Sequence, residues 1–182
     1  MDIQLIDTGF FHADGGAMFG AIPKTAWSRR YPSDKQNGCI LAMRRMLVRD
    51  GNGKIVLVDN GAGNKHLKQL SYYNFFDLVD LKDELQRRDV ACEDVTDVIL
   101  THLHFDHCGY TTQKEEQTGG KHLFKMAFPN AIHWVSRAQW ENFLHPNALE
   151  ADSYLIENMQ AVYDSGKLRL IENDTNLCPG ID

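Results

Sequence analysis

Residues 101–109 have the sequence Thr-His-Leu-His-Phe-Asp-His-Cys-Gly, which places three histidines and one aspartate within six residues. Imidazole nitrogen and carboxylate oxygen are ligands that Zn²⁺, Fe and Mn accept in proteins. The apolar run Val98–Leu100 precedes this stretch and predicts a short buried strand. The histidines would therefore follow the carboxyl end of a strand, and the stretch predicts a metal site there.

The spacing within this stretch indicates two neighbouring metal positions. His102 and His104 lie two residues apart, and a tight loop after a strand end can turn both side chains toward one ion. Asp106 and His107 would then face a second ion. An isolated histidine is more often a packing or surface residue, but four ligand-type side chains together favour a metal site.

Upstream of the histidines, the sequence predicts strands joined by a hairpin. Residues 39–50 and 54–60 are apolar and β-leaning, and they flank Asp50–Gly53. This segment contains DG and NG pairs, which favour positive φ in tight turns. The opening residues 3–11 also predict a strand. Residues 12–37 are rich in glycine, proline and aromatic side chains and predict a long loop, and such loops are often functional.

The rest of the chain alternates between predicted strands and helices. Leucine spacing, with acids early and bases late, predicts a helix over residues 77–88. The other predicted elements are strands over 98–100, 131–135 and 167–171, helices over 136–144 (with Ser136 as N-cap) and 151–163, and an exposed loop over 114–121. The alternation indicates the α/β class, with helices packed on the faces of a sheet in one domain over residues 1–182.

Composition limits the classes of partner. The 182 residues are 43% hydrophobic and 24% charged, which is typical of a globular chain. The net charge of -6 argues against a nucleic-acid backbone or an anionic membrane as the main partner. No apolar run approaches the length of a membrane span, and the acidic N-terminus lacks the pattern of a signal peptide. We therefore expect a cytoplasmic protein with a small-molecule substrate and no nucleic-acid or membrane partner.

The segment Thr101–Gly109 resembles the HxHxDH signature of the metallo-β-lactamase superfamily, which is preceded by Thr and followed by Gly. The run Val56–Gly61 is similar to the family's upstream strand, which ends in Asp and Gly. The resemblance implies that Asp59 lies beneath the metals and orients their ligands by hydrogen bonds. Without the resemblance, Asp59 could simply form the turn at a strand end. Asn60 stands where the family often has Thr.

The resemblance implies a four-layer αββα sandwich, in which two sheets pack face to face, and a metal-dependent hydrolase. Its cofactors would be two divalent metal ions, Zn²⁺ with Fe or Mn as alternatives, which convert a water to hydroxide near neutral pH. His102 and His104 would bind the first ion, and Asp106 and His107 the second. Asp106 would also act in catalysis by accepting a hydrogen bond from, or a proton of, that water. The hydroxide would attack an ester, lactone, thioester or phosphoester.

A weaker resemblance concerns the long N-terminal loop. Residues 14–27 are similar to the entry segment of the branch that includes acyl-homoserine lactonases and methyl-parathion-hydrolase-like enzymes. On that analogy Met18, Phe19 and Trp27 would line an apolar substrate pocket. The alternative is that these side chains pack the loop onto the sheet.

The chain departs from the family pattern in its second half. The family site needs three more ligands, namely a histidine in a Gly-His segment, a bridging aspartate and a final histidine. His122, His133 and His145 follow the motif, but none follows a glycine at a strand end, and we expect surface or packing roles for them. We therefore expect the N-terminal part of the fold, incomplete at its C-terminus, with low metal occupancy. Its exposed apolar sheet face would favour a homo-oligomer or cover by another chain.

Three functional hypotheses follow. The leading one is a metal-dependent hydrolase of the lactonase-like branch. The second is a thioesterase of the glyoxalase II type, or an iron-dependent oxidative enzyme, on the same fold. The third is a truncated, inactive half-fold that self-associates.

Two further groups of residues have simpler interpretations. The pairs Arg29–Arg30, Arg44–Arg45 and Arg87–Arg88 are scattered among more numerous acids, so we expect solvated surface residues. The four cysteines form no CxxC pair, and we expect free thiols. Cys108, directly after His107, would pack beside the site, with a functional thiol as the alternative.

Overall fold

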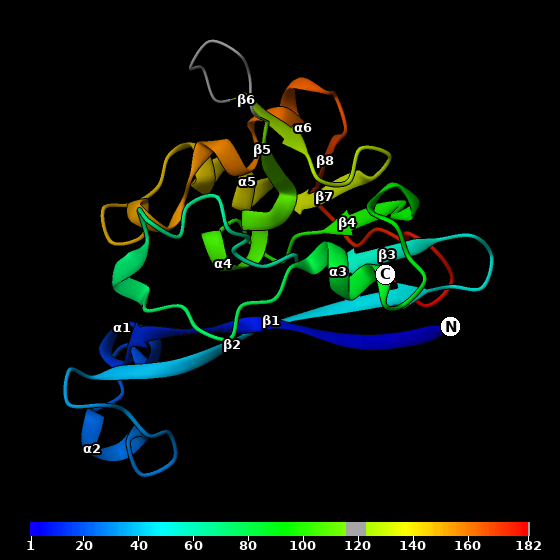
Figure 1. The fold of residues 1–182 in the computed structure, drawn as a ribbon. Coiled ribbons are helices and arrows are strands. Elements are labelled where there is room, and N and C mark those ends of the chain that lie inside the picture. The colour runs from blue at the N-terminus through cyan, green and yellow to red at the C-terminus, as the bar shows by residue number, and fades with distance from the viewer. Residues whose placement is uncertain (116–122, 182) are drawn as a thin grey trace.

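The computed structural model describes residues 1–115 and 123–181. Its main feature is a six-stranded sheet with the order β1-β2-β3-β4-β7-β8 (Figure 1). β1, β2 and β3 pair antiparallel, whereas β3, β4, β7 and β8 run parallel. The strands are β1 (Asp2–Asp14), β2 (Gly38–Arg49), β3 (Ile55–Val58), β4 (Asp97–Ile99), β7 (Ile132–Ser136) and β8 (Leu168–Ile171), and β5 (Thr112–Glu115) pairs with β6 (Leu123–Met126) in a separate hairpin.

Helices cover one face of the large sheet. Leu47, Leu57 and Val98 lie directly opposite one another on adjacent strands and point into the main core. Leu81 and Leu85 of α3 pack into the same core, together with side chains of α5 and α6. The helices are α1 (Gly15–Phe19), α2 (Lys24–Trp27), α3 (Leu81–Gln86), α4 (Phe105–Cys108), α5 (Arg137–Leu144) and α6 (Gln160–Asp164), and the 3₁₀ turns are η1 (Ser71–Tyr73), η2 (Cys92–Asp94), η3 (Gly109–Thr111), η4 (Ala151–Ser153) and η5 (Ile156–Asn158).

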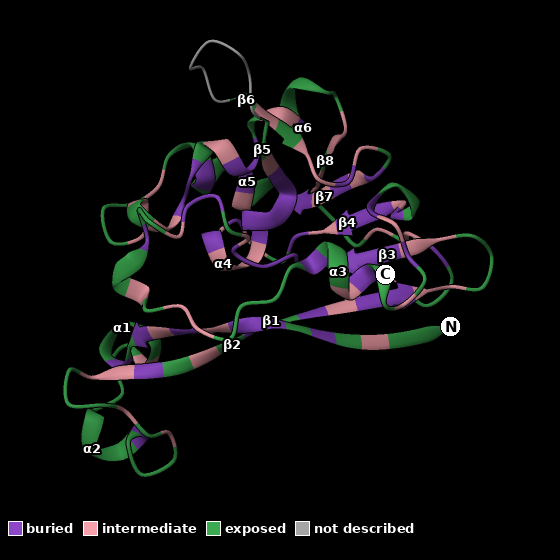
Figure 2. Ribbon diagram, in the orientation of Figure 1, coloured by how far each residue is buried: buried purple, intermediate pink, exposed green. Residues whose placement is uncertain are grey.

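The opposite face of the sheet is only partly covered. Leu5 pairs with Met46 on this face, and Ile3 and Leu5 are 56% and 61% exposed. Figure 2 shows that the N-terminal part of β1 is mostly exposed. The C-terminal residues 172–181 lie over Ile99 and Trp134 and bound a cavity there. The exposed apolar side chains on β1 are those expected of a sheet that lacks a second layer. Within the described ranges, no helix is long and apolar enough to cross a bilayer.

The predicted hairpin and most of the predicted strands are confirmed. β2 and β3 are joined at residues 50–54, where Gly51 and Gly53 adopt φ of 85° and 102°. The Asp50 carboxylate accepts hydrogen bonds from the backbone N–H groups of Asn52 and Lys54, at 2.7 and 2.9 Å. α5 also begins as predicted, because the Ser136 hydroxyl accepts the Gln139 N–H.

The predicted loop over residues 12–37 is wrong in part. β1 continues to Asp14, and the segment contains α1 and α2. The Asp14 carboxylate accepts hydrogen bonds from the N–H groups of Gly16 and Ala17, at 2.7 and 3.1 Å, and so starts α1 despite the two glycines. Figure 1 shows both helices at the end of an arm formed by β1 and β2.

Two predicted helices are shorter than expected. Asp77 has a φ of 49°, and α3 begins only after Asp80, whose carboxylate accepts the Lys82 N–H at 2.8 Å. The helix predicted over residues 151–163 is broken at Tyr154 and Leu155. The backbone is extended there, and both side chains are buried. Of the predicted loop over 114–121, residues 114 and 115 belong to β5, and the rest, with His122, lies outside the described residues.

His133 is a fully buried histidine and gives the fold a pH dependence. It is fully buried on β7, neither ring nitrogen has a hydrogen-bond partner, and burial lowers its pKa to about 4. The unfolded chain, with a histidine pKa of about 6.5, binds the proton more readily between pH 6.5 and 4. This contribution to stability is therefore complete above pH 6.5 and is lost as the pH falls toward 4.

Between pH 7 and pH 5 the free energy of unfolding of the wild type should fall because His133 resists protonation. We predict that this fall is smaller by about 2 kcal/mol in His133→Leu. Urea unfolding at the two pH values measures this difference. His145→Gln, at an exposed histidine after α5, is the control and should leave the pH dependence unchanged. An unchanged pH dependence in His133→Leu would show that other groups are responsible.

Candidate metal centre

The site is built where two parallel strands end side by side. Asp59 follows β3 and Thr101 follows the adjacent strand β4, and the carboxyl ends of parallel strands are a common place for binding sites. The Thr101 N–H donates to Asp59 Oδ1 at 2.9 Å, and the Thr101 hydroxyl donates to Oδ2 at 2.8 Å. Asp59 is largely buried, with a φ of 57°. These hydrogen bonds fasten the start of the histidine segment to the end of β3.

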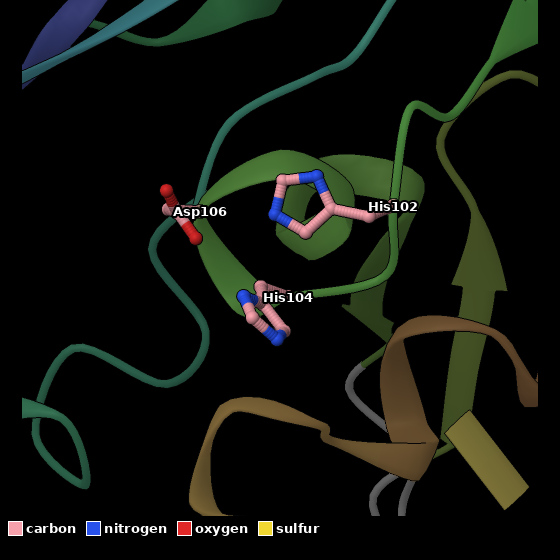
Figure 3. A group of neighbouring side chains, drawn as sticks. All are labelled: His102, His104 and Asp106. Atoms are coloured by element: carbon pink, nitrogen blue, oxygen red, sulfur yellow. The ribbon is translucent and has the colours of Figure 1, made fainter. Parts of the chain in front are cut away.

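His102, His104 and Asp106 form a group that can hold a metal ion. Each offers one ligand atom, and these atoms all lie within 4.8 Å of one another (Figure 3). His102 and His104 lie on the loop after β4, and Asp106 lies in the first turn of α4. In the described ranges 1–115 and 123–181, no other group of three or more His, Cys, Asp or Glu side chains has this geometry. The two histidines and the aspartate of this turn could therefore bind one metal ion together.

His107 lies beside this group and is held from two sides. Its Nδ1 lies 2.7 Å from Asp59 Oδ2, and its Nε2 lies 3.2 Å from Asp106 Oδ2. Its ring centroid is 3.8 Å from that of His102. The structure thus brings all four predicted ligands and Asp59 together, and Asp106 approaches both the histidine pair and His107.

The imidazoles of the site differ in charge. Burial, together with the neighbouring His107 and His104, lowers the pKa of His102 to about 4. Burial also disfavours the charged form of His107, but Asp106 and Asp59 outweigh it and raise the pKa of His107 to about 9. The two carboxylates therefore favour the protonated form of His107 at neutral pH. Metal binding through Nε2 of His107 would release that proton.

Residues behind the site fix the end of α4. The Asn60 side chain accepts the Tyr110 N–H at 2.9 Å and donates to the Thr111 hydroxyl at 2.7 Å, so this departure from the family pattern has a bracing role. A Cβ atom on Gly109 would lie 2.3 Å from the Ala62 carbonyl oxygen. Only glycine allows α4 to approach the loop after β3 this closely.

Arg45 lies beneath the site, which corrects the prediction that Arg44 and Arg45 are both solvated. Arg45 is 2% exposed, and its guanidinium donates to the backbone carbonyl of Asp106. Burial lowers its pKa to about 10, while the carboxylates of Asp59 and Asp106 favour its charge. Arg44 points to the other face and forms an exposed ion pair with Asp7 at 2.7 Å. The alternation of side chains along β2 thus separates two adjacent arginines.

We predict that Arg45→Met lowers the free energy of unfolding by about 3 kcal/mol, because it removes one partner from a buried group of charges. The control Arg44→Met breaks an exposed ion pair and should cost less than about 1 kcal/mol. Urea unfolding of the metal-free proteins measures both values. Equal effects of the two substitutions would contradict the bracing role of Arg45.

The remaining predicted residues lie away from the histidines or have packing roles. Trp27 is buried and stacks on Phe19 with ring centroids 4.5 Å apart, while Met18 is half exposed. These residues belong to α1 and α2 at the end of the arm (Figure 1), and their pocket role stays a prediction. His145 is exposed. Cys108 is fully buried, which raises its pKa to about 12, so it packs beside the site as a thiol.

Two further residues near the site were not predicted from the sequence. Glu150 Oε2 lies 3.9 Å from Nε2 of His104, and the Tyr154 ring packs against His104 with centroids 4.8 Å apart. Both residues follow α5 and reach the site through a segment that the sequence predicts partly as helix. Their irregular backbone has no hydrophobic period from which the contact could be predicted.

Comparisons with known proteins agree with this geometry. Residues 46–110, which include Asp59 and the histidine segment, match the model of the metallo-beta-lactamase superfamily. A search of curated proteins found no match. Among solved structures, a probable metal-dependent hydrolase from Staphylococcus aureus has 31% identity and a TM-score of 0.84, over 98% of this chain and 61% of its own.

Two lactonase structures share the fold at lower identity. AidC, a dizinc quorum-quenching lactonase, has 20% identity and a TM-score of 0.66, over 96% of this chain and 59% of its own. An N-acyl homoserine lactone hydrolase has 21% identity and a TM-score of 0.65, over 98% of this chain and 62% of its own. The chain therefore spans about three fifths of the length of these structures.

The sheet, the covering helices and the histidine–aspartate turn form the fold that the chain shares with these structural neighbours. Residues 46–110 match the metallo-β-lactamase superfamily, and 98% of the chain shares its fold with a probable metal-dependent hydrolase. The chain corresponds to part of the sandwich found in its structural neighbours, as the exposed face of β1 indicates.

Proposed function

We propose that the protein is a metal-dependent hydrolase that acts on an ester, lactone or related bond in a small molecule. The observation that carries the proposal is the group His102, His104 and Asp106, whose ligand atoms lie within 4.8 Å of one another. The fold shared with two lactonases supports the lactone as the first substrate to test.

The side chains have distinct roles in this proposal. His102 and His104 would hold the first ion, and Asp106 and His107 would hold the second. Asp106 suits a shared role because its carboxylate belongs to the group with His102 and His104 and also lies 3.2 Å from Nε2 of His107. When bound, the ions supply hydroxide at neutral pH by lowering the pKa of water to about 7. Asp59 keeps Nδ1 of His107 occupied, so Nε2 is the nitrogen that would bind the second ion.

The cofactor and setting are part of the proposal. We propose Zn²⁺ as the metal, since one structural neighbour is a dizinc enzyme, with Fe and Mn as alternatives. The ligands in this chain make up part of a dinuclear site, so activity requires the further ligands that the family resemblance implies. We also propose a cytoplasmic setting.

The experiment is a hydrolysis screen with lactones, thioesters and phosphotriesters, each with added Zn²⁺, Mn²⁺ or Fe²⁺. In protein that also supplies those further ligands, we expect metal-dependent hydrolysis of a lactone or ester, and its loss in His102→Ala. Hydrolysis of thioesters alone would favour the glyoxalase II type. Redox turnover with bound iron and no hydrolysis would contradict the proposal in favour of oxidative chemistry.

A second candidate is supported by the exposed face of β1. The apolar side chains of Ile3 and Leu5 favour self-association of the chain, with weak metal binding. Size measurement in solution during a metal titration tests this candidate. A monomer with two tightly bound metals would contradict it, whereas a metal-poor oligomer would support it.

A further inference from the structure

One ring nitrogen of His104 has no hydrogen-bond partner. Its Nε2 atom is buried and unpaired. Figure 3 shows one nitrogen of His104 directed toward Asp106 and the other directed away. Glu150 Oε2 lies 3.9 Å from Nε2, so Nδ1 is the nitrogen that faces the ligand group. A buried N–H that stays unpaired is costly, so Nε2 needs an acceptor.

Glu150 is placed to be that acceptor. The Tyr154 hydroxyl donates to Glu150 Oε2 at 3.3 Å, and the Tyr154 ring packs against His104. The Glu150 side chain is 40% exposed, so it has room to rotate and close the remaining distance to Nε2. The three side chains thus form a chain of contacts that runs from the protein surface to the metal ligand group.

We propose that Glu150 is a positioning residue that sets the tautomer and orientation of His104. The Glu150 carboxylate accepts a hydrogen bond from the Nε2–H group of His104. The lone pair of the neutral ring is then on Nδ1. Nδ1 then faces the point shared with His102 and Asp106. Tyr154 holds the carboxylate in place. This inference rests on the proposed metal site, and it adds a residue to which neither the sequence motif nor the family match extends.

The first test is the affinity of the protein for Co²⁺, measured by its visible absorption. Glu150→Ala should weaken binding by about 10- to 100-fold, the range typical of an acceptor behind a metal-bound histidine. Glu150→Gln should restore part of the affinity, since an amide oxygen can still accept the hydrogen bond. Glu141→Ala, at an exposed glutamate on α5, is the matched control and should bind Co²⁺ like the wild type.

The second test reports the tautomer without any activity. In the zinc-loaded protein, ¹⁵N NMR should show His104 protonated at Nε2 and bound to zinc through Nδ1. Zinc on Nε2, or equal Co²⁺ affinity in Glu150→Ala and wild type, would overturn the inference while leaving the hydrolase proposal intact. Absence of any bound metal in the wild type would overturn both. Tyr154→Phe should weaken Co²⁺ binding less than Glu150→Ala, and a larger effect would contradict the order of contacts.

Discussion

Replacing Asp106 with alanine should abolish metal-dependent hydrolysis and weaken metal binding more than any other single substitution in the site. The Asp106 carboxylate shares the ligand group with His102 and His104 and also contacts Nε2 of His107. Its loss removes a ligand and the negative charge that offsets the ion. The affinity should fall by more than the roughly 10- to 100-fold that removal of a supporting partner costs. Calorimetric titration with Zn²⁺ measures this change.

Asp7→Ala is the control for this experiment. Asp7 is an exposed aspartate whose partner is Arg44, on the face of β2 opposite to Arg45. Its removal should leave the zinc affinity and the rate unchanged. Full activity of Asp106→Ala with two metals bound would show that Asp106 neither binds metal nor takes part in catalysis.

Replacing Asp59 with asparagine should lower the zinc affinity by about 10- to 100-fold. The Asp59 carboxylate contacts Nδ1 of His107 at 2.7 Å and accepts two hydrogen bonds from Thr101. Burial opposes its charge, but hydrogen bonds from His107 and Thr101 keep its pKa below the ordinary value. Asparagine keeps the shape but loses the charge that favours the His107 imidazolium. Hence the pKa of His107, followed by NMR, should fall from about 9.

Asp97→Asn separates this effect from a general loss of stability. Asp97 is as buried as Asp59 and accepts hydrogen bonds from Lys54 and Trp134 at 2.7 and 2.9 Å, but it starts β4 rather than following a strand end. Both substitutions should destabilise the fold, and only Asp59→Asn should weaken zinc binding. Equal zinc affinities in the two variants would assign Asp59 a role in folding alone.

The core of the site could be predicted from sequence because its parts are local. His102, His104, Asp106 and His107 lie within one turn after a strand, and a buried strand is recognisable from its apolar run. Asp59 lies 42 positions before Thr101, yet it is placed by the neighbouring parallel strand β3. The positions of these residues could be predicted because the local sequence pattern and the order of the strands both favour the observed fold.

Other features depend on contacts that no local pattern describes. α1 forms because a side-chain cap outweighs two glycines, and the interruption at Tyr154 and Leu155 occurs because tertiary burial outweighs helical spacing. The buried Arg45 could have been found from alternation along β2, since it lies on the same face as Leu47. Glu150 approaches His104 from a distant loop, and its position follows from the fold as a whole.

The most direct test of the account is the position of zinc in crystals of the protein, located by anomalous diffraction at the zinc edge. We expect an anomalous peak between His102, His104 and Asp106, within about 2.0–2.2 Å of one nitrogen or oxygen atom of each. The peak should be absent in Asp106→Ala crystals treated identically. Zinc bound only at other side chains, or no peak at this turn at saturating zinc, would contradict the claim that the turn after β4 is the metal centre.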